Sequence, residues 1–476
     1  MHDALDDTIC AIATPPGEGG IGVVRISGPR ALDLASHVVR LRSGTSLQAL
    51  RPRTMGLADV FSRTMASPFP IDPDAPSHAF IDEALVVVMR RPHSFTGEDV
   101  VEVQCHGGPV ILDQLCRTLM SAGARLAAPG EFTKRAFLNG RLDLAQAEAV
   151  LDTIRAKTAR SLAIAQSQRR GELSQEVEAT RSALVVALAH IEAALDFAEE
   201  DITFVQQDEL MRLLEGTTAR LRRLVRSGEE GRIWREGAAV AILGRPNVGK
   251  SSLMNALLKT ERAIVTPVPG TTRDMLEEVV SIDGIPVRLF DTAGIRSTDD
   301  PVEAEGIRRS HLAWEEADLA LILLDGSQPL SECDRVLLAR QEAAQALLVI
   351  NKCDLPRRLV KEALVCACPT SADVIDISAT MQIGLEGLRK AIRSRLTPSL
   401  LESQDSVLVT NLRHAAALER ALQGVEEARR SVEAGRAGEL VAMDLRIAAD
   451  ALGEITGVIT TDEILERIFA EFCIGK

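Results

Sequence analysis

Aromatic residues are scarce in this sequence, and its positive charges are outnumbered by negative ones. The 476 residues include no tyrosine and only two tryptophans, and aromatic residues make up 3% of the chain. Proteins that bind single strands of nucleic acid by stacking need such rings, so their scarcity argues against that role as the main function. The formal net charge is −14, whereas a protein that coats nucleic acid is basic overall. The composition therefore argues against a general nucleic-acid coat protein, although it is compatible with a local basic patch.

The cysteines and apolar residues argue against two further classes. The eight cysteines are scattered, and the only close pair, Cys366 and Cys368, does not form a C-x₂-C set of metal ligands. No run of about 18 apolar residues occurs, so we expect no segment that spans a membrane. The first residues, Met1–Asp7, are acidic and lack the basic and apolar regions of a signal peptide. We therefore expect a cytoplasmic protein with reduced thiols.

One glycine-rich stretch has a specific spacing. The segment Gly244–Ser252 matches G-x-x-x-x-G-K-[ST], a loop whose backbone N–H groups cradle phosphates. The apolar run 238–243 has the length of a strand, and the run 252–258 is helical. The loop therefore joins a buried strand to a helix N-terminus, where the helix dipole favours anions. In this pattern Lys250 reaches the terminal phosphates and the Ser251 hydroxyl holds Mg²⁺. The sequence predicts a nucleotide site here.

Four further polar segments follow in the order expected of a GTP-binding domain. Thr272 is expected to complete the Mg²⁺ shell, Asp291 to hold Mg²⁺ through water, and the Gly294 N–H to contact the γ-phosphate. Asp354 can accept hydrogen bonds from guanine N1–H and the 2-amino group, which predicts GTP rather than ATP. We expect a doubly wound sheet with the ligand at the carboxyl ends of its strands. The predicted GTP contacts are Asn247, Val248, Gly249, Lys250, Ser251, Ser252, Thr266, Pro267, Val268, Pro269, Gly270, Thr271, Thr272, Asp291, Thr292, Ala293, Gly294, Asn351, Lys352, Asp354, Ser378 and Ala379.

The predicted hydrolytic machinery differs from that of small GTPases. Where those proteins place the glutamine that orients the attacking water, this chain has Ile295, which cannot polarise water. No arginine is obviously placed as an internal finger. Glu303 is a candidate for orienting the water. Asn247 is a candidate for coordinating a monovalent cation, whose charge would replace that of an arginine finger. The alternative is that these two residues are a solvated loop acid and a turn asparagine.

The regions on either side of the nucleotide domain differ in pattern. Residues 1–125 have the pattern of a mixed α/β unit, with a helix expected over 30–41 and an irregular, proline-rich stretch over 52–79. Glu102 lies on a predicted buried strand, so its carboxylate must be paired or bind something. Residues from about 130 to 226 and from 405 to 472 are helical, with a single apolar stripe predicted from Leu144 to Ala165. We expect one helical domain built from both blocks, with the nucleotide domain inserted between them.

Other segments resemble one family. The resemblance is carried by Ala13–Gly17, Phe95–Val100, Gly107–Pro109, Pro129–Phe132, Arg135–Asn139, Gly244–Ser252, Pro269–Asp274, Asp291–Arg296 and Phe472–Lys476. In these segments, and over its whole length, the sequence is similar to the TrmE (MnmE) family of tRNA-modification GTPases. The resemblance implies an N-terminal α/β domain like a tetrahydrofolate-binding fold (1–126), a discontinuous helical domain (127–236 and 400–476) and an inserted Ras-like P-loop GTPase domain (237–399).

The resemblance also implies ligands and partners. It implies a homodimer joined through the N-terminal domains, whose G domains dimerise across GTP and K⁺ to activate hydrolysis, with Glu303 orienting the water. By match, K⁺ would be held by Asn247, Thr266, Val268 and Thr271, and Mg²⁺ by Ser251 and Thr272. A reduced folate (5,10-methylene- or 5-formyl-tetrahydrofolate) would bind at Arg25, Glu102, Arg141 and Lys476. Some members carry lysine at the position of Arg141. Arginine keeps the positive charge, but its planar guanidinium differs in geometry from the ammonium group of lysine.

The family works with the FAD-dependent protein MnmG, as a heterotetramer. Together they add an aminomethyl or carboxymethylaminomethyl group to C5 of the wobble uridine of certain tRNAs, with a methylene-tetrahydrofolate carbon. Cys473 stands four residues from the end, as in a prenylation box, but glycine and lysine are atypical at the last two positions. Its role is either redox or catalytic, or the tail simply docks near the folate. Two other functions stay open: a regulatory or ribosome-assembly GTPase, and a folate aminomethyltransferase that merely carries a GTPase domain.

Overall fold

The computed structural model describes residues 6–63, 78–196, 207–260, 278–291, 317–339, 346–360, 364, 374–397 and 407–476. The chain divides into two compact units, Met1–Leu151 with Thr456–Lys476, and Asp152–Ile455. In the parts of the chain that are described, no helix is both long enough and apolar enough to cross a membrane. The domain bounds at 126, 236 and 399 stay a prediction.

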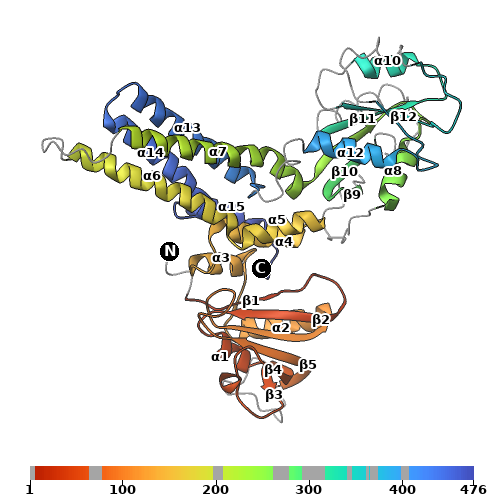
Figure 1. Cartoon of the computed structure of the whole chain (residues 1–476). Helices are drawn as coiled ribbons and strands as arrows, with labels where there is room; N and C mark the ends of the chain where they lie inside the picture. Colours follow the sequence, from red (N-terminus) through yellow and green to blue (C-terminus); the bar gives the residue numbers. More distant parts are fainter. Residues whose placement is uncertain are drawn as a thin grey trace. The chain divides into compact units, whose positions relative to one another are not determined.

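A seven-stranded sheet forms the centre of the first unit (Figure 1), in the order β3-β4-β5-β6-β2-β1-β7. β1 pairs with β7 in parallel, and the other neighbours are antiparallel. Helices α1 (Ala31–Ser36) and α2 (Pro109–Ser121) pack on the apolar face of this sheet. The strands are β1 (Ile9–Ile12), β2 (Gly19–Ser27), β3 (Val39–Leu41), β4 (Met55–Arg63), β5 (His78–Met89), β6 (Val100–Gly107) and β7 (Arg125–Leu126).

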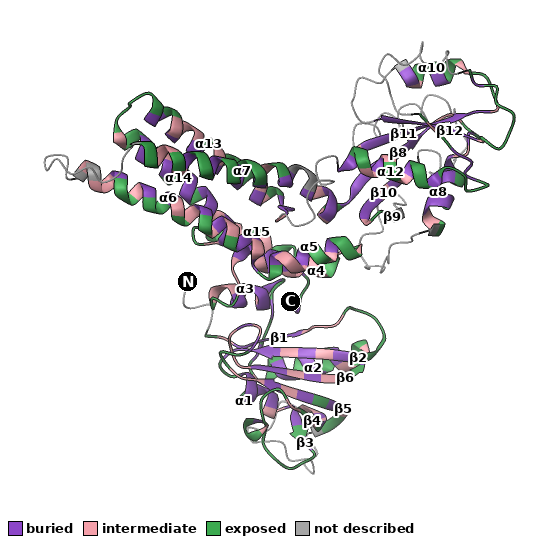
Figure 2. Ribbon diagram, viewed as in Figure 1, coloured by how far each residue is buried: buried purple, intermediate pink, exposed green. Residues whose placement is uncertain are grey.

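Alternation along the strands decides which side chains face the core. In β6, Val101, Val103 and Cys105 are buried against the helices, whereas Glu102 and Gln104 lie on the opposite, more exposed face. Figure 2 shows this alternation as buried and partly buried segments along the strands of the sheet. The sequence pattern of β6 therefore places the carboxylate of Glu102 on an accessible sheet face.

Two expectations for this unit were wrong. The helix predicted over 30–41 ends at Ser36, and β3 follows it. The stretch 52–79, predicted to be irregular, contains β4 and the start of β5. The proline at position 52 precedes β4 and does not interrupt it, and alternate residues such as Ala58 and Val60 are buried. Residues 64–77, which hold the other prolines of this stretch, lie outside the described residues.

Three helices complete the first unit. They are α3 (Glu131–Leu138), the first part of α4 (Leu144–Arg155) and α15 (Asp462–Ala470), and they share a small apolar core. Gly130 precedes α3 with φ of 65°, and a Cβ there would lie 2.7 Å from the carbonyl oxygen of Phe469. This close approach requires glycine and brings the C-terminal segment against the start of α3.

Long helices form much of the second unit: α5 (Ala159–Arg169), α6 (Glu172–Asp196), α7 (Gln207–Glu236), α13 (Leu412–Glu433) and α14 (Gly438–Thr456). The single stripe predicted from 144 to 165 was wrong, because α4 and α5 are separate helices and Ile154 is 48% exposed. Thr158 caps α5 by accepting a hydrogen bond of 3.1 Å from the Ser161 N–H.

Helices from before and after the nucleotide-binding segment pack together, which confirms a discontinuous helical domain with an insertion. α13 lies along α7, and Arg222 of α7 forms an ion pair of 2.7 Å with Glu426 of α13. A Cβ on Gly231 of α7 would lie 1.8 Å from the carbonyl oxygen of Val409, so this contact depends on glycine.

The inserted segment forms a six-stranded sheet in the order β13-β12-β11-β8-β10-β9 (Figure 1), with helices α8 (Lys250–Thr260), α10 (Glu332–Ala339) and α12 (Leu385–Leu396). All neighbours are parallel except β9 and β10. β8, β11 and β12 are buried along their whole length, as in a sheet covered on both faces (Figure 2). The predicted fold class is confirmed. The strands are β8 (Ala238–Leu243), β9 (Glu278–Ile282), β10 (Ile285–Asp291), β11 (Leu319–Asp325), β12 (Ala346–Asn351) and β13 (Val374–Asp376).

Candidate functional site

The glycine-rich loop lies where the sequence places it, between the end of β8 and the start of α8. Gly244 has φ of 153°, and a Cβ there would lie 2.5 Å from the carbonyl oxygen of Leu323 in β11. Gly249 has φ of 103°, and a Cβ there would lie 2.3 Å from Nδ2 of Asn351. Both positions combine a backbone conformation that disfavours side chains with a close approach to a neighbouring strand end. The two motif glycines are therefore required by the geometry.

A buried lysine supplies a fixed positive charge to this loop. Nζ of Lys250 donates hydrogen bonds to the carbonyl oxygens of Gly244 at 2.7 Å and Arg245 at 3.1 Å. Lys250 is the first residue of α8, so its charge adds to that of the helix N-terminus. Ser251 and Ser252 follow in the first turn and are exposed. Lysine, helix end and hydroxyls together form a site suited to phosphates.

One side chain joins three of the predicted nucleotide segments. Asn351 ends β12 and is buried; its Nδ2 donates to the carbonyl oxygen of Val248 at 2.8 Å. Its Oδ1 accepts from the backbone N–H of Ala379 at 3.0 Å. The glycine-rich loop, the segment Asn351–Asp354 and the segment that begins at Ser378 are therefore held together at one edge of the sheet, as the sequence predicts.

The remaining residues of these segments are also placed. Asp354 is exposed, so its carboxylate is available to a ligand. Ser378 is fully buried, and its Oγ accepts a hydrogen bond from the Met381 N–H at 3.2 Å, which orders the loop. Lys352 has φ of 65°, and its Nζ donates to the carbonyl oxygen of Asn247 at 3.1 Å. Asn247, the predicted cation ligand, is thus tied to the segment Asn351–Asp354, which is predicted to recognise guanine and is called the guanine-recognition segment below.

Sequence reasoning missed two residues of this site, Asp325 and Ser327. Asp325 ends β11, and its carboxylate accepts hydrogen bonds from Nζ of Lys352 at 2.7 Å and from Oγ of Ser327 at 2.6 Å. Burial acts to raise the pKa of Asp325, but the hydrogen bonds from Lys352 and Ser327 outweigh it and leave this pKa below its usual value. The apolar run Leu319–Leu324 directly before an acid is the sequence signal that could have identified this strand end.

Some predicted residues can be placed only in part. Asp291 ends β10, where its backbone pairs with Ile242 next to the glycine-rich loop. Several predicted GTP, Mg²⁺ and K⁺ contacts and the candidate water-orienting acid lie outside the described residues; they are Thr266, Pro267, Val268, Pro269, Gly270, Thr271, Thr272, Thr292, Ala293, Gly294 and Glu303.

A second polar cluster lies in the first unit. Nε of Arg25 in β2 donates to Oε1 of Glu102 in β6 at 2.8 Å, across directly paired strand positions. The guanidinium of Arg25 also lies 5.6 Å from the ring centroid of Phe132 and donates to the carbonyl oxygen of Gly475 at 3.2 Å. Burial lowers the pKa of the Lys476 amine, and the positive charge of Arg25 lowers it further, although Glu102 opposes the shift. Arg25 is therefore paired with the partly buried carboxylate of Glu102, and the Lys476 amine lies within electrostatic range of both.

Main-chain hydrogen bonds dock the C-terminal tail at this cluster. The Gly130 N–H donates to the carbonyl oxygen of Cys473 at 3.4 Å, and the Phe132 N–H donates to that of Lys476 at 3.1 Å. Cys473 itself is exposed. Arg141 is exposed and lies beside Gly97; within the described residues, no hydrogen bond or ion pair joins it to Arg25, Glu102 or Lys476. The structure thus brings together three of the four predicted folate residues.

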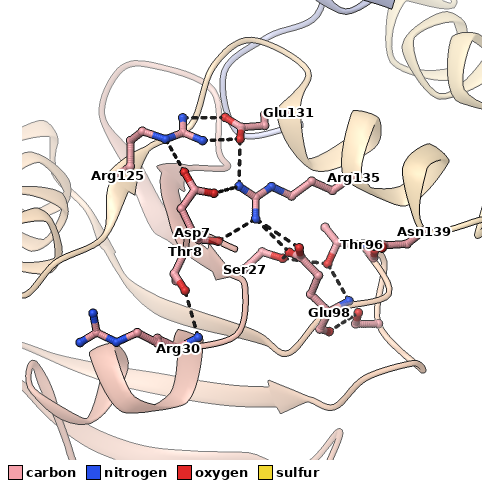
Figure 3. Close-up of polar contacts among 11 residues, drawn as sticks. Asp7, Thr8, Ser27, Arg30, Thr96, Glu98, Arg125, Glu131, Arg135 and Asn139 are labelled. Carbon is pink, nitrogen blue, oxygen red and sulfur yellow. Dashed lines mark hydrogen bonds and ion pairs between the residues drawn. The ribbon is translucent and has the colours of Figure 1, made fainter. Parts of the chain in front are cut away.

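A buried arginine anchors α3, which carries Phe132. The side chain of Arg135 is 2% exposed, and its guanidinium donates to Oδ1 of Asp7 at 2.5 Å, Oε1 of Glu131 at 3.0 Å and Oε1 of Glu98 at 3.2 Å. Figure 3 shows this guanidinium between the three carboxylates. Arg125 forms a second ion pair with both Asp7 and Glu131 at 2.6 Å. This network connects α3 to the residues before β1 and before β6.

Comparisons with known proteins match the whole chain. Residues 8–141 match the family "GTP-binding protein TrmE N-terminus", and residues 144–473 match the "MnmE helical domain". The tRNA modification GTPase MnmE of Geobacter sulfurreducens is 44% identical over 473 residues, covering 99% of this chain and 100% of that protein. That of Chloroflexus aurantiacus is 46% identical over 474 residues, with the same coverage. A solved structure of an Aquifex aeolicus Era variant bound to GDP and AlF₄⁻ is similar over 39% of this chain and 65% of its own, at 28% identity and a TM-score of 0.27.

Proposed function

This chain belongs to the MnmE family of tRNA modification GTPases, and from that premise we propose a specific reaction for it. It is a GTPase that acts in tRNA modification. In our proposal K⁺ stimulates its GTP hydrolysis, and with an FAD-dependent partner, MnmG, it adds an aminomethyl or carboxymethylaminomethyl group to C5 of the wobble uridine. The carbon comes from methylene-tetrahydrofolate. We place the protein in the cytoplasm, as a homodimer that assembles with MnmG into a heterotetramer. Its proposed domains are the N-terminal domain (1–126), the helical domain (127–236 and 400–476) and the GTPase domain (237–399).

The single observation that best supports guanine nucleotide binding is the position of Asn351. Its side chain joins the glycine-rich loop to Ala379, and three residues later the exposed carboxylate of Asp354 can accept from guanine N1–H and the 2-amino group. Adenine does not offer that pair of donors. Lys250 and the N–H groups at the start of α8 would bind the phosphates.

Metal ions would bind beside these phosphates. Ser251 and Thr272 would hold Mg²⁺, with Asp291 acting through water, and the bound ion would neutralise charge on the β- and γ-phosphates. Asn247 would hold K⁺ together with Thr266, Val268 and Thr271, and this ion would supply the positive charge that an arginine finger supplies elsewhere. The donor set supports this: the Asn247 backbone is held by Lys352, and Ser251 is exposed in the first turn of α8.

Orientation of the attacking water falls to Glu303 in this proposal, because Ile295 stands where small GTPases have glutamine. A carboxylate can accept a hydrogen bond from water and orient its lone pair, whereas an isoleucine side chain cannot. K⁺ would lower the charge cost of the transition state, and Glu303 would position the nucleophile.

The cluster of Arg25, Glu102 and Lys476 would bind the reduced folate. The Glu102 carboxylate would accept from the amino and ring N–H groups of the pterin, and the basic side chains would meet the folate carboxylates. The partly buried pair of Arg25 and Glu102, with the Lys476 amine beside it at a lowered pKa, supports a ligand site at this cluster. Arg141 would join only when the ligand is bound. Cys473, exposed next to this cluster, stays a candidate for a redox or catalytic role.

A deletion strain complemented with variants tests this function. Loss of wobble-uridine modification in the deletion strain, restored by the wild-type gene but not by Asp291→Ala, is the expected result. If modification stays intact in the deletion strain, the protein is a regulatory GTPase without a direct role in modification. If modification survives with Asp291→Ala as the only copy, the chain is a folate aminomethyltransferase that merely carries a GTPase domain.

A further inference from the structure

The end of β11 carries a buried carboxylate to which the GTPase reaction as described gives no task. Asp325 pairs in register with Asn351, so the ends of β11 and β12 lie side by side at the nucleotide edge of the sheet. The Asp325 side chain is 3% exposed. A buried carboxylate is costly unless its oxygens are hydrogen-bonded, so its partners indicate its purpose.

Both oxygens of this carboxylate have partners. Oδ1 accepts from the N–H of Ser327 at 2.9 Å and from its Oγ at 2.6 Å. Oδ2 accepts from Nζ of Lys352 at 2.7 Å. Because Ser327 holds one oxygen through two hydrogen bonds, the other oxygen is fixed in place and can orient the lysine.

Lys352, which Asp325 orients, also contacts the glycine-rich loop. Its Nζ also donates to the carbonyl oxygen of Asn247 at 3.1 Å. Lys352 and Asn247 both have left-handed backbone conformations, with φ of 65° and 63°. Such conformations are unfavourable for residues other than glycine and persist only where surrounding contacts hold them. The ammonium group of Lys352 therefore joins one strained residue to the main chain of the other.

We propose that Asp325 is a positioning residue for GTP binding, which acts through Lys352 to fix Asn247 and so couples the guanine-recognition segment to the glycine-rich loop. Asp325 does not touch the nucleotide in this proposal. Its carboxylate orients the ammonium group of Lys352 so that this group also donates a hydrogen bond to the Asn247 carbonyl oxygen. The loop therefore keeps its phosphate-binding shape before the nucleotide arrives, which reduces the ordering cost of binding.

A double-mutant cycle on nucleotide affinity tests the proposal. The probe is a fluorescent GDP, titrated into the full-length protein in Na⁺ buffer with Mg²⁺. Loss of one hydrogen bond to a charged group weakens binding by roughly 10- to 100-fold, and we expect a loss in that range for Asp325→Asn. Lys352→Met should also weaken binding. In the Lys352→Met background, Asp325→Asn should add less than about twofold, because its only route to the loop is gone.

Asp318→Asn is the matched control. Like Asp325, Asp318 is an acid paired with a basic side chain, but it directly precedes β11, at the opposite end of that strand, and contacts Arg232 and the Ala239 N–H. It should leave GDP affinity unchanged. If Asp325→Asn fails to fold, Ser327→Ala carries the test, since it removes one hydrogen bond to the same carboxylate; we expect a roughly three- to tenfold loss of affinity. Unchanged affinity in Asp325→Asn, equal loss in Asp318→Asn, or full additivity with Lys352→Met would each overturn the proposal.

The positioning of Asn247 by Asp325 and Lys352 should also affect K⁺ binding, and this part of the inference rests on the proposed function. Because Asn247 is the residue assigned to K⁺, Asp325→Asn should raise the K⁺ concentration that gives half-maximal GTP hydrolysis, whereas Asp318→Asn should not. An unshifted K⁺ requirement would confine the role of Asp325 to nucleotide affinity and refute this extension. If K⁺ fails to stimulate even the wild-type protein, the proposed function fails, while the affinity cycle still decides the role of Asp325.

Discussion

Replacing Arg135 with methionine should loosen the first unit locally. The substitution keeps much of the apolar stem and removes a guanidinium that is 2% exposed and contacts three carboxylates. Removing one partner of a buried ion pair costs about 3–5 kcal/mol, because the remaining charge is buried without compensation. Arg125 still pairs with Asp7 and Glu131 in the variant, and only Glu98 loses its cation. We therefore expect a cost at the lower end, about 3 kcal/mol.

Hydrogen exchange measured by mass spectrometry resolves this effect in a chain of several domains, where a single unfolding transition is not defined. A cost of about 3 kcal/mol corresponds to roughly 10²-fold faster exchange of amides in β1 and α3. Arg117→Met is the control, because Arg117 is 73% exposed and, among the residues that the structure describes, forms an ion pair only with Asp113, one helical turn away. Its exchange should change less than about threefold. Equal protection in wild type and Arg135→Met, or equal losses in both variants, would refute the role given to the network.

Three further predictions concern acid stability, the glycine-rich loop and the folate cluster. Burial acts to raise the pKa values of Asp7 and Glu131, but Arg125 and Arg135 outweigh it and hold both pKa values below their usual range. The two carboxylates therefore stabilise the first unit fully above about pH 4.5, and this stabilisation should disappear as the pH falls through their pKa values in the folded protein. Exchange in β1 that is insensitive to pH 3–5, after correction for intrinsic rates, would contradict this. Gly249→Ala should abolish binding of fluorescent GDP, because its Cβ would lie 2.3 Å from Nδ2 of Asn351, whereas Gly216→Ala, with open space around it, should bind normally. Glu102→Gln should weaken 5-formyl-tetrahydrofolate binding in calorimetry by roughly tenfold or more and leave GTP hydrolysis unchanged; retained folate affinity would remove Glu102 from that site.

Contiguous patterns made the nucleotide site predictable from sequence. The loop Gly244–Ser252 lies on consecutive residues, and its flanking runs indicate a strand and a helix without reference to the rest of the chain. Asn351 was predicted for the same reason, since its segment follows an apolar strand. The hydrogen bonds that Asn351 makes to Val248 and Ala379 were not predictable, because they depend on how parallel strands far apart in sequence align.

Features that depend on packing were missed or wrong. Asp325 and Lys352 are separated by many residues, and only the pairing of β11 with β12 brings them together. The apolar pattern from 144 to 165 is continuous in the sequence and so predicted one stripe. In the structure a new helix, α5, begins after Thr158, which caps it, so the pattern spans two helices. The start of β4 was hidden by a neighbouring proline that lies outside the strand. In each case a local pattern was compatible with two structures, and tertiary contacts decided between them.

Steady-state GTP hydrolysis by the purified protein, in K⁺ and in Na⁺ at matched ionic strength, tests the central claim most directly. The account predicts much faster turnover in K⁺, and loss of that difference in Asn247→Ala. Such a result would support a cation at Asn247 in the place of an arginine finger. Equal rates in the two salts would contradict the assignment of K⁺ to Asn247 and its loop, and the family membership would then stand without this mechanism.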